Sequence, residues 1–199
     1  MKRFLLGGLL FLLVLLAGCD TSSTTTPTGY NLALTGGQRP SLSAGHIDRI
    51  LAGSPAAGTG GTIYQLGVSY KIDPVFFLGF FWEESRFATD PNGLVAKLDL
   101  NPGSIECTGP SSPDRKPRYT CPTKFRKYAT WADGEQDWFE LIAYGYVYGD
   151  HGQFVSPQCP CTDVQSVVNV YAPSTENNVK AYVSTVEAKV DAWRSEGYN

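Results

Sequence analysis

The sequence predicts a mainly helical α+β domain in which a small β-hairpin or loop insertion follows the third helix. Three observations predict this fold class. Apolar residues recur at helical spacing in several segments, helix-start signals precede most of them, and turn-forming residues concentrate at positions 88–128 beside short β-like stretches. The chain has 199 residues, and the part that follows its N-terminal segments has the size of one globular domain.

The N-terminus has the layout of a secretory signal. Lys2 and Arg3 precede an apolar run at 4–16, and Leu-Ala-Gly-Cys follows at 16–19. The run is short for a membrane span. The small pair before the cysteine resembles the lipobox of bacterial lipoproteins. This resemblance implies that residues 1–18 are removed, that Cys19 is lipidated, and that the exported protein is anchored to the cell-envelope membrane at the cell surface or in the periplasm. An ordinary signal peptide or an uncleaved anchor is the alternative.

Residues 19–40 are rich in Ser, Thr, Pro and Gly. Such a stretch buries too little apolar surface to fold alone, so we expect a flexible tether there and the globular domain at 41–199. The chain has 16 basic and 19 acidic residues, and loss of Lys2 and Arg3 with the signal makes the mature chain more acidic still. This balance argues against nucleic-acid binding.

The first half of the domain should contain three helices. We expect them at 44–51, at 60–70 and from Pro74 to Ser85. Asp73 can cap the N-terminus of the third helix, and Pro74 suits its first position. Residues 88–128 are then expected to form loops and a small hairpin.

The second half should again be helical. The stretch Thr-Trp-Ala-Asp at 130–133 has the spacing of a capping box and opens a helix that runs to about Tyr148. Thr162 and Asp163 open another helix by the same chemistry. The last helix, 177–194, carries apolar residues at helical spacing: Val179, Tyr182, Val183, Val186, Val190 and Trp193. These side chains are expected to form core.

Glu84 ends the aromatic third helix and is the first candidate for chemistry. Phe77, Phe80 and Phe81 lie three to seven residues before it and share its helix face. Desolvation by these rings and the negative end of the helix dipole should raise the pKa of this carboxyl. A carboxylic acid that stays protonated near neutral pH is what leaving-group protonation in glycoside hydrolysis requires. An exposed acidic pair, Glu83 with Glu84, is the alternative.

Four cysteines remain besides Cys19, namely Cys107, Cys121, Cys159 and Cys161. Export favours disulfides. Cys107 and Cys121 enclose a Pro-rich loop that one bridge could close. A mutual bridge between Cys159 and Cys161 would be strained because a single residue separates them, so cross-pairing stays open, as does a four-thiolate zinc site, although the spacing is unusual for zinc.

Five blocks follow one another along the domain. They are 46–60 (His-Ile-Asp-Arg-Ile-Leu-Ala-Gly-Ser-Pro-Ala-Ala-Gly-Thr-Gly), 70–74 (Tyr-Lys-Ile-Asp-Pro) leading to Glu84 and Ser85, 101–105 (Asn-Pro-Gly-Ser-Ile), 131–134 (Trp-Ala-Asp-Gly) and 170–173 (Val-Tyr-Ala-Pro). In this order they resemble the glucosaminidase family of bacterial cell-wall hydrolases (mannosyl-glycoprotein endo-β-N-acetylglucosaminidase-like), whose peptidoglycan hydrolase domains have a lysozyme-like fold. The resemblance covers nearly all of the globular part.

The resemblance implies roles for several residues. Glu84 would be the general acid, and Tyr171 would match the family tyrosine that faces it. An inverting route needs a second carboxylate, for which Asp90, Asp99 and Glu106 are candidates and Glu106 is preferred because it follows the 101–105 block. We assign substrate binding to three further residues: Trp82, which could stack on a sugar, Ser85 and Asn101.

One segment departs from the family pattern. Many relatives have small residues after the Glu-Ser pair, whereas this chain has Arg-Phe-Ala-Thr-Asp at 86–90, whose bulk could reshape the cleft floor. Three functions therefore remain open: an endo-β-N-acetylglucosaminidase, a lytic transglycosylase on the same fold, and a non-catalytic glycan-binding lipoprotein. We expect peptidoglycan or another N-acetylglucosamine-containing glycan as the partner, a membrane contact through the lipid on Cys19, a monomer, and no metal or organic cofactor.

Overall fold

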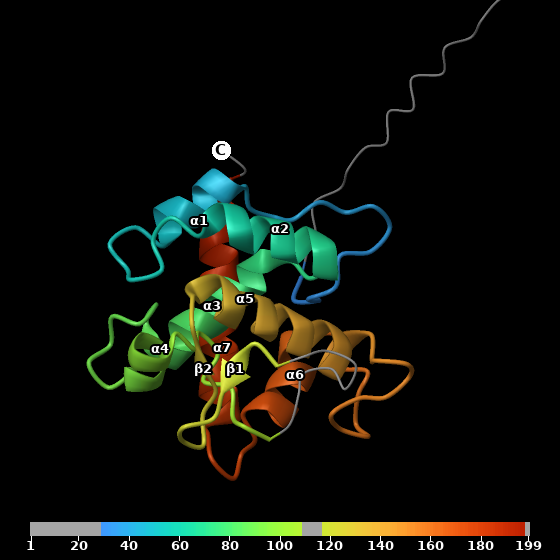
Figure 1. Ribbon diagram of the computed structural model, residues 1–199. Helices are drawn as coiled ribbons and strands as arrows, with labels where there is room; N and C mark the ends of the chain where they lie inside the picture. Colours follow the sequence, from blue (N-terminus) through green and yellow to red (C-terminus); the bar gives the residue numbers. More distant parts are fainter. Residues whose placement is uncertain (1–28, 109–116, 198–199) are drawn as a thin grey trace, which may run out of the picture.

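The computed structural model describes residues 29–108 and 117–197, and it confirms a mainly helical fold with one small antiparallel sheet (Figure 1). The proposed signal peptide and Cys19 lie outside the described residues. In chain order the elements are α1 (Ala44–Ile50), α2 (Gly60–Tyr70), α3 (Pro74–Ser85), α4 (Leu94–Asp99), β1 (Tyr119–Thr120), β2 (Lys127–Tyr128), α5 (Trp131–Glu140), η1 (Leu141–Val147), α6 (Val164–Tyr171) and α7 (Val179–Ser195).

Helix α3 runs through the middle of the domain and has the bounds that the sequence predicts. Asp73 caps it by accepting from the backbone N–H of Val75 at 3.4 Å. The same carboxylate, fully buried, pairs with Arg194 of α7 at 2.9 Å, so the cap also ties α7 to the start of α3. Since both oxygens have partners, this buried charge is compensated.

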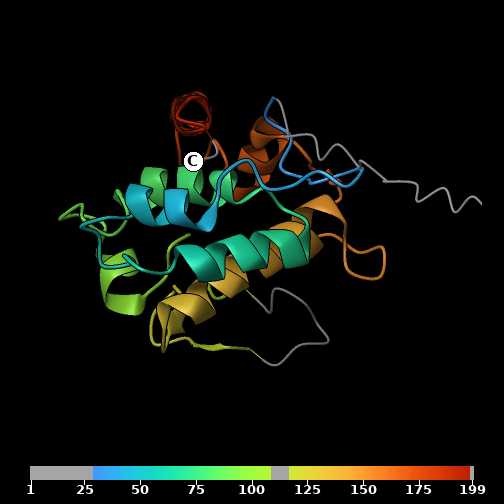
Figure 2. The same ribbon diagram turned by 90° about the horizontal axis from the view of Figure 1, so that it is seen from above.

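The aromatic face of α3 forms the core with α5. Phe77 and Phe80 lie 5.2 and 5.5 Å from Trp138, measured between ring centroids, in edge-on contacts. Helices α1 and α2 lie together on one side of α3, and the view from above shows α7 nearly end-on along the opposite edge (Figures 1 and 2). A Cβ on Gly79 would lie 3.0 Å from Cγ1 of Val186, so this glycine lets α3 and α7 approach closely.

The structure differs from the predicted helix at 130–148 in its second half. Thr130 does cap α5, accepting from the N–H of Asp133 at 3.2 Å, but the turns widen into the π-helix η1 after Glu140. Backbone carbonyls of η1 are used by the loop that follows, because Gly145 accepts from the N–H of Val155 at 2.9 Å. Such outside partners compete with the regular α-helical bonds.

Other details differ from the prediction: α1 ends one residue earlier, at Ile50, and α7 spans Val179–Ser195 where 177–194 is predicted. The region expected to be loops and hairpin contains the short helix α4, which has no side-chain N-cap to announce it. Helix α6 begins one residue later than predicted, because Asp163 is its N-cap and forms a capping box with Ser166. The hairpin itself is present, with Tyr119 opposite Tyr128.

The predicted tether boundary at residue 40 is too late. Residues 30–34 lie on the domain, where the N–H of Leu32 donates to Thr162 and its carbonyl accepts from Asp73, both at 2.8 Å. Leu32 is fully buried, and Leu34 is nearly so. Two leucines at alternate positions are enough to dock this strand-like segment, although its composition is otherwise polar.

The described cysteines form two disulfides. Cys107 pairs with Cys121, and Cys159 pairs with Cys161. Of the pairings that the sequence left open, the structure has the mutual Cys159–Cys161 bridge, because the turn brings the two Cα atoms to 4.5 Å, within the range that disulfides adopt. With all four thiols oxidised, neither cross-pairing nor a zinc site made of these cysteines remains.

Within residues 29–108 and 117–197, no helix is long and apolar enough to cross a membrane.

Candidate active site

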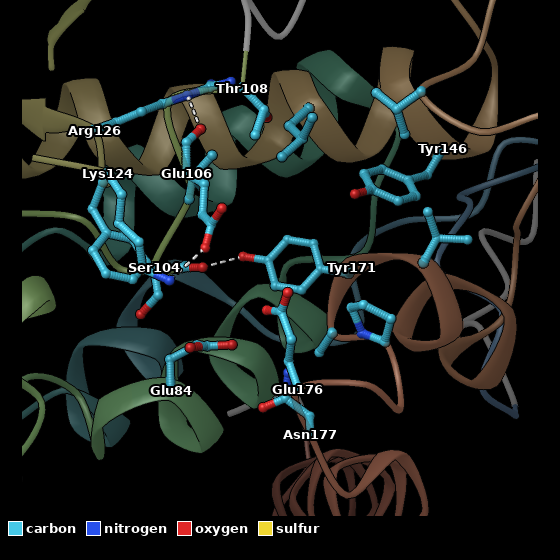
Figure 3. Close-up of a pocket in the computed structure, with 18 residues that line it drawn as sticks. Glu84, Ser104, Glu106, Thr108, Lys124, Arg126, Tyr146, Tyr171, Glu176 and Asn177 are labelled. Atoms are coloured by element: carbon cyan, nitrogen blue, oxygen red, sulfur yellow. Dashed lines mark hydrogen bonds and ion pairs between the residues drawn. The ribbon is translucent and has the colours of Figure 1, made fainter.

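A cleft of about 690 Å³ opens beside the end of α3. One wall is formed by the loop 103–108 and residues 124–126 of the hairpin, and the other by residues 170–177 at the end of α6. Glu84 lies at the floor, and Glu106 and Glu176 reach the cleft from different walls (Figure 3). The far end is apolar, with Leu141, Tyr146, Val155 and Val170.

Glu84 is held from the α7 side. Its Oε1 accepts a hydrogen bond from the hydroxyl of Tyr182 at 2.7 Å. Burial raises the pKa of this carboxyl above its usual value, hydrogen bonds from Tyr182 and Ser104 oppose the rise, and the neighbouring charge of Glu83 adds to it. The sequence-based expectation of a raised pKa through burial is confirmed, and the carboxyl keeps its proton to a higher pH than an exposed glutamate.

Glu83 has a different environment. It does not line the cleft, and it lies 3.7 Å from the guanidinium of Arg86, its ion-pair partner one turn on. Burial raises the pKa of this carboxyl too, against the opposing charge of Arg86. Of the two adjacent glutamates, Glu84 alone is positioned to meet a molecule in the cleft.

The loop 101–105 is held by Asn101. Its side-chain amide donates to the carbonyls of Ile105 and Arg126 at 3.0 and 2.9 Å and accepts from the N–H of Ile105 at 2.9 Å. Asn101 is fully buried and does not line the cleft. It therefore shapes the wall, including Ser104, whose φ of 49° is unusual for a residue with a side chain.

Tyr171 lines the cleft together with Glu84 (Figure 3). Its hydroxyl donates to the carbonyl of Gly103, and its ring meets Phe80 edge-on at 5.3 Å. Burial, followed by the charge of Glu84, raises the pKa of this phenol well above its usual value. Tyr171 is therefore a neutral donor that joins α6 to the opposite wall.

A Cβ on Gly103 would collide with the Tyr171 hydroxyl and with Trp138. Glycine at this position is what allows the two walls to meet.

Among the three candidates for a second carboxylate, Glu106 is the one that lines the cleft. Its side chain is 40% exposed and pairs with Lys124 at 2.9 Å. Asp99 pairs instead with Lys127 at 3.2 Å, and Asp90 accepts from the N–H of Asn92 in a turn. Glu176, which sequence reasoning did not select, also lines the cleft, and its charge raises the pKa of Lys124, after the larger effect of Glu106.

Trp82 and Ser85, which we expected to bind substrate, do not line this cleft. The ammonium of Lys189 lies 4.0 Å from the centroid of the Trp82 ring, on the side toward α7. The hydroxyl of Ser85 is buried, donates to the carbonyl of Phe81 and accepts from the N–H of Ala88. Both residues support the end of α3.

The bulky segment 86–90 does not form the cleft floor. Arg86, Phe87 and Ala88 all have positive φ, between 52° and 61°, and make a left-handed turn. Phe87 is buried against Phe81 and Trp193, and none of these residues lines the cleft. The bulk of this segment therefore packs away from the cleft.

No cluster of three or more His, Cys, Asp or Glu side chains that could hold a metal ion occurs among the described residues. No family model matches the sequence, and no curated protein matches it either.

Proposed function

We propose that the protein is a glycoside hydrolase that cuts β-1,4 bonds in N-acetylglucosamine-containing glycans, with Glu84 as general acid. The observation that carries the proposal is a desolvated carboxyl at the floor of a cleft large enough for sugar rings. The order of family-like blocks in the sequence supports the choice of substrate and a lysozyme-like arrangement of the domain.

The chemistry follows from the residues at the site. Glu84 protonates the glycosidic oxygen while an oxocarbenium-like centre develops on the sugar. Water then attacks from the other face. Glu106 lines the cleft and can serve as its base, although Lys124 pairs with its Oε1; assistance from the substrate's own N-acetyl group is the alternative. Tyr171 lines the cleft and can contact the substrate.

Peptidoglycan is the proposed substrate because the N-terminal signal and Cys19 would place the domain in the cell envelope, held by a lipid. A monomer on such an anchor can reach glycan strands near its membrane.

The Glu106–Lys124 ion pair favours a second candidate, a lytic transglycosylase. In that reaction the muramic hydroxyl replaces water as the nucleophile. No free second carboxylate is then required, and the products carry anhydro ends.

Digestion of purified peptidoglycan tests the proposal, with mass spectrometry of the product ends. We expect new N-acetylglucosamine reducing ends from the wild type and none from Glu84→Gln. Glu83→Gln is the matched control, since it removes a carboxyl one residue away that does not line the cleft. Anhydromuramic ends would select the transglycosylase. A wild type that binds glycan without cutting it would make this a glycan-binding protein.

A further inference from the structure

We propose that Tyr182 is a positioning residue of this site: its hydroxyl, donated to Oε1 of Glu84, confines the catalytic proton to Oε2. This inference rests on the proposed function for its catalytic meaning. The contact joins residues 98 positions apart, on α7 and α3. Burial alone raises the pKa of Glu84 but does not decide which of its two oxygens carries the proton; the hydrogen bond from Tyr182 does.

The direction of the hydrogen bond follows from the surroundings of Tyr182. The side chain is 5% exposed, and the described residues offer its hydroxyl no hydrogen-bond acceptor besides Glu84. If Glu84 carried its proton on Oε1, Tyr182 would have to accept it, and the phenol O–H would be buried without a partner. An unsatisfied buried donor bears its full desolvation penalty, so the arrangement with the proton on Oε2 is favoured.

The hydroxyl also remains a donor at every working pH. Burial, followed by the charge of Glu84, raises the pKa of Tyr182 well above its usual value. Tyr182 therefore cannot take over the role of acid or base. Its proposed role is to set the oxygen of Glu84 on which the proton lies, as a hydrogen bond sets the tautomer of a catalytic histidine.

Oε2 is then the oxygen that carries the proton toward the glycosidic bond. Ser104, the other hydrogen-bond partner of Glu84, has a hydroxyl that can accept from a protonated Oε2 as well as donate to an ionised carboxylate. The other groups that face the carboxyl are Ser104 from the wall loop, Glu83 on the same helix and Tyr171 from α6. Tyr171 already donates to the carbonyl of Gly103, so it does not compete for Oε1. A protonated Oε2 at the floor of the cleft is the orientation that general-acid catalysis needs.

Removal of the Tyr182 hydroxyl should change both the pKa of Glu84 and the rate of glycan cleavage. In Tyr182→Phe the ionised form of Glu84 loses a hydrogen bond, so the pKa of Glu84 rises and the alkaline limb of the kcat/KM profile moves to higher pH. With the proton free to occupy either oxygen, about half of the molecules hold it on Oε2, so kcat should fall about twofold while KM stays unchanged.

The pKa of Glu84 can be measured without activity, by NMR titration of glutamate ¹³Cδ signals assigned with Glu84→Gln. The ring of Tyr182 remains packed in the phenylalanine variant, since it meets Phe80 at 5.5 Å. Tyr148→Phe is the control, because that hydroxyl donates to the carbonyl of Lys71 and does not line the cleft. As a second variant, 3-fluorotyrosine in place of Tyr182 keeps the shape, strengthens the donor and should lower the pKa of Glu84.

An unchanged Glu84 titration in both Tyr182 variants would overturn the inference, even if activity fell, because the loss would then come from packing. A raised pKa in Tyr182→Phe together with the shifted alkaline limb supports it. Should the wild type cut no glycan, the proposed function fails on its own, while the titration still decides whether Tyr182 controls the Glu84 carboxyl.

Discussion

Glu135 on α5 should make the stability of the fold depend on pH near neutrality. The residue is fully buried, and neither carboxyl oxygen has a hydrogen-bond partner among the described residues. The hydroxyl of Thr59 is near, but it donates to the carbonyl of Ala56 at 3.0 Å. Burial therefore dominates and raises the pKa of Glu135 to about 7, against a smaller lowering by Thr59.

The sign follows from proton binding. Between the ordinary value of 4.5 and the folded value of about 7, the folded state holds a proton that the unfolded state has lost. The neutral form of Glu135 thus contributes stability at low pH, and this contribution disappears as the pH rises through 7. At 1.36 kcal/mol per pKa unit, the full change is on the order of 3 kcal/mol.

The test compares urea unfolding of the wild type and Glu135→Gln at pH 5, 7 and 9 with the disulfides intact. The amide is neutral throughout, so the two proteins should be close at pH 5, and the variant should be more stable at pH 9 by up to about 3 kcal/mol. In melting temperature this is roughly 6–12 °C for a domain of this size. Glu176→Gln, on the exposed loop between α6 and α7, controls for the loss of one negative charge. A stability difference between Glu135→Gln and wild type that is the same at all three pH values would refute the reasoning.

Three further substitutions test the meeting of the two cleft walls, the docked segment at 30–34 and the C-terminal end of α2. Gly103→Ala should push Tyr171 from the wall and reduce glycan cleavage at least tenfold while far-UV circular dichroism stays unchanged; full activity would show that the two walls need not meet. Leu32→Ala should lower the free energy of unfolding by about 2–5 kcal/mol in urea titrations, whereas a true tether residue would change nothing. Lys71→Gly relieves a left-handed backbone at the C-cap of α2, with a φ of 56°, and should raise stability by about 0.5–1 kcal/mol; a lower melting temperature would contradict this.

The elements with local signals were predictable. Asp73, Pro74 and the run of aromatic residues define α3 within a dozen positions, and the structure returns the same bounds. The capping of α5 by Thr130 is equally local. The docked segment at 30–34 was missed because two leucines in a polar stretch are a weak local signal. The segment becomes extended only because its N–H groups donate to the carbonyls of Lys71 and Thr162, which are distant in the sequence.

The candidate site was predictable only in part, for a physical reason that Tyr182 makes plain. An apolar stripe at helical spacing predicts that α7 is buried, and Tyr182 is indeed buried, but the stripe does not say which buried hydroxyl ends beside Glu84. That depends on how closely α7 approaches α3, which Gly79 permits and sequence spacing does not measure. Glu176 was missed for a related reason: nothing in the local sequence distinguishes it from any other acidic loop residue, and only the fold brings it to the cleft. The proposed general acid can thus be found from its own helix, whereas the groups that contact it come from distant segments and are identified only when those segments are packed together.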